Sequence, residues 1–116
     1  MINLKSNVYS ALNAITAISD RVYFFYPDDF TTLPCVSYYE ITNKETAGAD
    51  DDEYQSEIEF IVDVWSKSSS EISSIALEVN TAMQGLGFKR TASRDMSEQD
   101  TKIYHKNMKF SQMVCE

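Results

Sequence analysis

Residues 54 to 65, YQSEIEFIVDVW, alternate between apolar and polar side chains with a period of two. One side of the segment carries the apolar residues Tyr54, Ile58, Phe60, Val62 and Val64. The other side carries Gln55, Glu57, Glu59 and Asp63, and it is interrupted by Ile61 and Trp65. This period does not suit a helix, and it predicts a strand in a sheet that buries one face.

The residues that follow this strand show the period of a helix over about 69 to 86. Ser68 and Glu71 fit a capping box at its start, and Gly87 stands where a left-handed residue ends many helices. Its apolar stripe consists of Ile72, Ile75, Ala76, Val79, Met83 and Leu86. We therefore expect this helix to pack on the apolar face of the sheet.

The rest of the chain predicts one more helix and four more strands. An apolar stripe indicates a first helix over about residues 5 to 18, capped by Asn3 or Ser6. The strands are expected in RVYFFYP, in CVSYYEITN after Pro34, in FKRTASRD and in KIYHKNMKFSQMV, with polar turns at 43–53 and 96–101. The order α-β-β-β-α-β-β predicts an α+β, two-layer domain with two helices on one face of a mostly antiparallel sheet. A chain of 116 residues fits a single domain, residues 1–116.

The negative charge of the chain is concentrated in one segment. The net charge is −8, and residues 44 to 63 alone hold eight acidic residues and one lysine, which gives −7. Residues 87 to 110 hold six basic and three acidic residues, which gives +3. An acidic chain of this kind should not grip a nucleic-acid backbone, and no apolar run is long enough to span a membrane.

The search for catalytic or metal-binding residues predicts no such site. His105 is the only histidine, and its strand neighbours indicate an exposed position pointing away from the core. The run from Asp50 to Glu53 lacks the order of an EF-hand loop, so a solvated loop is favoured over calcium binding. Glu57 and Glu59 lie two apart on a strand, but no pocket-forming residues accompany them as a glycosidase would require. Trp65 is left with two interpretations, a cover for the sheet edge or an interface anchor.

Three segments together resemble the tail-completion proteins of long-tailed bacteriophages, the family of tail terminators and tail-to-head joining proteins. They are LPCVSYYEI, EYQSEIEFIVDVWSKSSSEISSIALEVNTAMQGLGF and DTKIYHKNMKFSQ. The shared pattern is a strand led by proline, a strand ending in D-x-W-S, a serine-capped helix ending in G-F, and a hairpin with Y-H-K-x-M-x-F. The resemblance runs from the first helix to the last strand, but it does not include the acidic run.

The resemblance implies a non-enzymatic ring subunit with no cofactor and no metal. Such proteins have an α+β fold and assemble as hexamers at the top of the tail tube, and they can be monomers before assembly. The implied partners are further copies of the chain, the tail tube protein and the head connector or stopper protein, with DNA passing through the ring. The implied location is the tail of a virion of an active phage or prophage, made in the cytoplasm of a bacterial host and away from membranes.

Charge suggests how the residues of such a ring are used. Asp50, Asp51, Asp52 and Glu53 are expected to face the lumen, where they would repel DNA phosphates. Ring closure joins unlike patches, so the acidic strand face of one subunit is expected to meet the basic stretch of the next. The candidates for that interface are Glu57, Glu59, Asp63 and Trp65 on one side and Lys89, Arg90 and Arg94 on the other, with Lys102 and Lys109 as further cations.

Two other functions stay open at the level of sequence. One is a small α+β binding or assembly module outside phage biology, which would show a peptide or small-molecule groove. The other is a small enzyme, because an α+β fold alone does not exclude catalysis. A pocket with convergent polar groups around His105 would favour the enzyme.

Overall fold

The computed structural model describes residues 2–27, 32–47, 54–98 and 102–115. Two α-helices and five strands follow the predicted order, with one short 3-10 turn between the first helix and the first strand. The helices are α1 (Lys5–Asn13) and α2 (Ser69–Gly85), and the 3-10 turn η1 spans Thr16–Ile18. The strands are β1 (Val22–Phe24), β2 (Cys35–Ala47), β3 (Tyr54–Ser66), β4 (Lys89–Glu98) and β5 (Ile103–Cys115).

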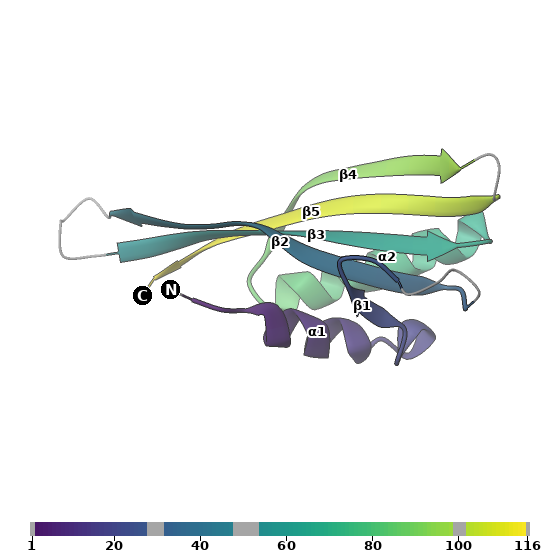
Figure 1. Ribbon diagram of the computed structural model, residues 1–116, viewed down its shortest axis with the longest axis horizontal. Coiled ribbons are helices and arrows are strands. Elements are labelled where there is room, and N and C mark those ends of the chain that lie inside the picture. Colours follow the sequence, from purple (N-terminus) through teal and green to yellow (C-terminus); the bar gives the residue numbers. More distant parts are fainter. Residues whose placement is uncertain (1, 28–31, 48–53, 99–101, 116) are drawn as a thin grey trace.

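The five strands form one open sheet in the order β1-β2-β3-β5-β4. Only the contact of β1 with β2 is parallel, and the other three are antiparallel. Both helices pack on the same face of this sheet (Figure 1). The predicted α+β class, the two layers and the mostly antiparallel sheet are therefore confirmed.

The main core lies between the helices and the sheet face that the alternating segment predicts. Ile58, Phe60, Val62 and Val64 are fully buried there. The predicted stripe of α2 meets them, with Ile72, Ile75, Ala76, Val79 and Met83 buried. The opposite face was predicted to be exposed, and this is wrong at one end of β3. There a second cluster of Cys35, Trp65 and Ile103 is buried beneath Tyr23 and Leu33.

Several predicted boundaries differ from the structure. The first helix ends at Asn13 rather than near residue 18, because Ile15 adopts an extended conformation and η1 then brings Ile18 into the core. Its backbone N-cap is Leu4, although the predicted capping residue Asn3 does accept a hydrogen bond from the Lys5 N–H at 3.1 Å. The expected turn over 43–53 is shorter, because β2 stays paired with β3 up to Ala47. Likewise β4 continues to Glu98, through half of the turn expected at 96–101.

The extended pairing of β2 and β3 makes the molecule long. Its principal extents are 52 × 24 × 23 Å, and the β2–β3 hairpin reaches well beyond the helices (Figure 1). The end of β5 accompanies this arm, since Gln55 pairs with Cys115. We call the part of the β2–β3 hairpin beyond the helices the arm; its last described pair is Ala47 opposite Tyr54. None of the described helices is long and apolar enough to cross a membrane.

Gly87 ends α2 as the sequence predicts. Its φ angle is +94°, and the amides of Gly87 and Phe88 donate to the carbonyls of Gln84 and Met83 at 2.9 and 3.0 Å, the pattern of a Schellman motif. A Cβ at this position would also lie 2.8 Å from Oε1 of Gln112. The turn sends the chain directly into β4, so Gly87 fixes where the basic strand begins.

Replacing this glycine is expected to destabilise the fold. Gly87→Ala should lower the free energy of unfolding by about 1–2 kcal/mol, because an alanine is strained in the left-handed backbone conformation and because Gln112 must move. Gly85→Ala is the matched control, since nothing lies within 4 Å of its added Cβ and its φ is helical. The control should be neutral or stabilising by up to about 1 kcal/mol. Urea denaturation of both variants tests this, and equal effects would contradict it.

Candidate functional site

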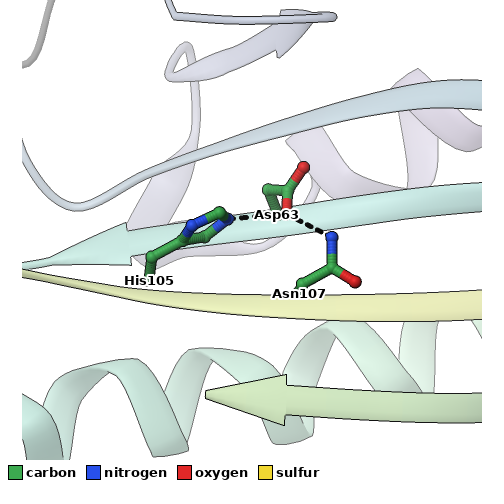
Figure 2. A network of polar contacts seen from close by, with 3 residues as sticks. All are labelled: Asp63, His105 and Asn107. Atoms are coloured by element: carbon green, nitrogen blue, oxygen red, sulfur yellow. Dashed lines mark hydrogen bonds and ion pairs between the residues drawn. The ribbon is translucent and has the colours of Figure 1, made fainter. Parts of the chain in front are cut away.

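Three charged or polar groups meet on the sheet face opposite the helices. Oδ1 of Asp63 on β3 lies 2.6 Å from Nε2 of His105, and the amide of Asn107 donates to the same oxygen at 2.8 Å (Figure 2). The strand pairing explains the meeting, because Asp63 lies directly opposite Asn107, and the pair of Trp65 with His105 lies two positions further along on the same face. We call Asp63, His105 and Asn107 the polar cluster.

The polar cluster is packed beneath apolar groups. The His105 ring stacks on Trp65 with 4.5 Å between centroids and 15° between planes. The side chains of His105 and Asp63 are only 13% and 6% exposed. Burial, followed by the charge of Asp63 and by Tyr26, raises the pKa of the neighbouring Tyr39 phenol, so Tyr39 stays protonated. The expectation of an exposed His105 is therefore wrong. Its side chain does point away from the helices, but Trp65 and Asp63 cover it.

A histidine held by a carboxylate is also how many enzymes orient a general base. Here the carboxylate is shared with an asparagine, and one face of the imidazole ring is covered by Trp65. His105 also lines a hollow of about 350 Å³ between α2, β4 and β5, together with Ser69, Ser73, Asp95 and Tyr104. The arrangement accounts for a satisfied, mostly buried carboxylate without requiring a reaction.

The predicted acidic face of β3 is largely matched within the subunit. Nζ of Lys109 lies 3.2 Å from Glu59, which leaves the Glu59 side chain 16% exposed. Glu57 stands opposite Lys44 in the β2–β3 register and is half-buried. Asp63 and Trp65 are each 4% exposed, so they offer little surface to a neighbour. Glu59 and Asp63 are therefore less accessible than the sequence pattern of one strand indicates, because Lys109, His105 and Asn107 of β5 contact them.

The predicted basic residues do lie at the surface. Lys89, Arg90 and Arg94 are exposed on β4, which is an edge strand with no neighbour on its outer side among the described residues. Of the other cations on this side, Lys106 pairs with Asp95 at 2.9 Å. The four lumen candidates Asp50, Asp51, Asp52 and Glu53 lie outside the described residues. Among the residues that the structure describes, no group of three histidines, cysteines or acids is placed to hold a metal ion.

One surface escaped the sequence-based reasoning. Four exposed aromatic side chains border β1 and α1: Tyr9, Phe24, Phe25 and Tyr26. Phe24 contacts Phe25 and Tyr38 with centroids 4.6 and 5.6 Å apart, and Phe25 stacks on Tyr39 at 5.4 Å. We call these four residues the aromatic edge. The sequence did carry a signal, because consecutive aromatics in a strand cannot all point to one buried face.

Comparison with known proteins agrees with this architecture. The family model for Tail completion protein gp17 matches residues 7–114 of the chain. A search of curated proteins finds no match. Among solved structures, the chain is similar to one from the "Virion of native gene transfer agent (GTA) particle", with a TM-score of 0.73 and 15% sequence identity. That likeness covers 94% of this chain and 92% of the other, and at this identity it concerns the fold.

Proposed function

The chain belongs to the Tail completion protein gp17 family, and from this membership we propose that it forms a ring that caps the tail tube and joins it to the head connector. At the level of the family, the protein is a structural component of a tailed, phage-like particle and not an enzyme. The match over residues 7–114 carries the proposal, because it includes every helix and strand except the first two residues of α1 and the last residue of β5. The partners of the ring would be further copies of the chain, the tail tube protein and a head connector or stopper protein.

The charge of the chain supports a ring through which DNA slides. Six copies at −8 each would carry a formal charge of −48. We place Asp50 to Glu53 at the lumen, because acids repel phosphates within a Debye length of about 8 Å at physiological salt. In the sequence they lie between Ala47 and Tyr54, the last described pair of the arm, which is beyond the helices.

The ring interface would use the surfaces that remain unmatched in one subunit. Lys89, Arg90 and Arg94 stay candidates because they are exposed on the edge strand β4. Glu57 stays a candidate on β3, where it lines a hollow with Lys89, whereas Glu59 already has Lys109 as its partner. Asp63 and Trp65 are assigned to the interior of the subunit instead, because their side chains are buried there.

Deleting the gene from a producing phage or prophage tests the proposed function. We expect filled heads and separate tails to accumulate, because the joint between them would lack its ring. Negative-stain electron microscopy of the lysate would show these two populations, and expression of the intact chain from a plasmid should restore complete particles. Complete particles in normal numbers without the protein would overturn the proposal.

A further inference from the structure

The aromatic edge exposes more apolar surface than one folded subunit requires. Tyr26 is 71% exposed, and Phe24 and Phe25 are about half exposed. Phe24 and Phe25 touch each other and contact Tyr38 and Tyr39 of β2, and Tyr26 follows them directly in the chain. The exposed rings therefore gather along the β1 edge rather than being scattered. Contiguous exposed apolar patches of this kind usually mark an interaction surface.

A groove at the opposite edge of the sheet, on the side that carries the helices, offers a complementary surface. It lies between α2 and β4, has a volume of about 340 Å³, and is lined by Ser73, Ala76, Leu77, Arg90, Ser93 and Lys106. Leu77 is 68% exposed although it sits in the middle of α2. We call this hollow the α2–β4 groove. It combines an apolar wall with two cations, which is a composition that suits aromatic rings.

The aromatic edge already shows that its rings accept a cation. Nζ of Lys5 lies 5.6 Å from the centroid of the Phe24 ring, within the range of a cation–π contact. The β4 side of the sheet supplies exposed arginine, the cation that most often stacks on aromatic faces. The two surfaces therefore match in both apolar character and electrostatics.

The two surfaces cannot meet within one subunit. β1 and β4 are the two edges of the sheet, with β2, β3 and β5 between them. Four strand spacings of about 4.8 Å separate them by roughly 19 Å. Contact between them therefore requires another copy of the chain, and different patches that meet in this way give a head-to-tail assembly that can close into a ring.

We propose that the aromatic edge of one subunit docks into the α2–β4 groove of the next, with Tyr26 against Leu77 and Arg90. This inference rests on the proposed ring, and it identifies the surfaces that close it. The contact leaves the arm free, because neither surface includes residues of the β2–β3 hairpin beyond the helices. It also gives Arg90 a neighbour other than the strand acids that are matched within the subunit.

Cysteine cross-linking in assembled particles tests the contact directly. In a Cys115→Ser background, which removes the exposed native thiol, Tyr26→Cys is combined with Ser93→Cys on the wall of the groove. Fewer particles should assemble, because Tyr26→Cys also removes the ring, so the complete particles are purified under reducing conditions before they are oxidised. They should then give a ladder of linked subunits on a non-reducing gel. A disulfide within one subunit is excluded, because it needs Cα atoms within about 7 Å of each other.

The controls separate this contact from a general proximity of subunits. Each single cysteine variant should give no ladder, and neither should Ser93→Cys combined with Met113→Cys, whose native side chain is exposed on the last strand near the arm. Complete particles that yield no ladder with the test pair would overturn the docking, while the proposed function would stand. Complete particles formed in normal numbers in the absence of the protein would instead contradict the proposed function.

Single substitutions provide a second measurement that does not depend on introduced cysteines. Tyr26→Ala should lower the yield of complete particles about ten-fold or more, because a buried interface aromatic is lost. Tyr26→Phe keeps the ring and should stay close to the unmodified protein, as should Met113→Ala away from the contact. Arg90→Ala should act like Tyr26→Ala. Equal yields from all four variants would overturn the proposal.

Discussion

Phe60→Ala is expected to lower the free energy of unfolding by about 3–5 kcal/mol. The side chain is fully buried on the helix-facing side of β3. It packs edge-on against Phe88, with 5.7 Å between centroids and 88° between planes, and lies 6.4 Å from the ring of Tyr38. Truncation would therefore leave a cavity where β3, β2 and the segment after α2 meet, and it would remove two aromatic contacts.

Urea denaturation followed by circular dichroism measures this effect. Tyr26→Ala is the matched control, because it also removes an aromatic ring, but from a position that is mostly exposed; we expect a change within about 0.5 kcal/mol. Where Phe60→Ala is too unstable to purify, Ile58→Val on the same face gives a milder deletion with an expected cost of about 0.5–1.5 kcal/mol. A cost for Phe60→Ala under about 1 kcal/mol would contradict its place in the core.

The helix-facing half of the molecule was predictable because local signals and burial agree there. The alternation around Phe60, the stripe on α2, the cap at Ser68 and the left-handed Gly87 each identify an element in one short window of sequence. Ser68 accepts the Glu71 amide at 3.2 Å as expected. The second hydrogen bond of the capping box, from the Ser68 amide to Glu71, is replaced by a bridge through Ser66. The Ser68 amide donates to the Ser66 hydroxyl, and that hydroxyl donates to the Glu71 carboxylate.

The opposite face was not predictable from one strand, because its chemistry depends on cross-strand register. From the sequence of β3 alone, Asp63 is expected to be solvated, but β5 places His105 and Asn107 beside it. Glu59 is likewise expected to be unpaired, but Lys109 of β5 forms an ion pair with it. The long arm was missed for a related reason: residues 43–47 are polar and look like a turn, yet backbone pairing with β3 keeps them in a strand.

The second large effect concerns the polar cluster. Asp63→Ala should cost about 1–3 kcal/mol of unfolding free energy, because it leaves two mostly buried donors, on His105 and Asn107, without their acceptor. Asp95→Ala is the matched control. It likewise removes an aspartate that contacts a side chain of β5, here Lys106 at 2.9 Å, but the Asp95 side chain is 79% exposed, so its loss should cost less than about 1 kcal/mol.

A double-mutant cycle with His105→Ala separates the contact from the side chains that make it. We expect Asp63 and His105 to be coupled by about 0.5–3 kcal/mol, whereas additive effects within about 0.3 kcal/mol would show that their 2.6 Å contact contributes nothing to stability. The same variants also test whether the pair has a chemical role. If the polar cluster only stabilises the sheet, the yield of complete particles from each variant should be proportional to the fraction of the variant that is folded. This yield is measured at a permissive temperature. Loss of particle completion by a variant that folds as stably as the unmodified protein would assign the polar cluster a direct part in assembly.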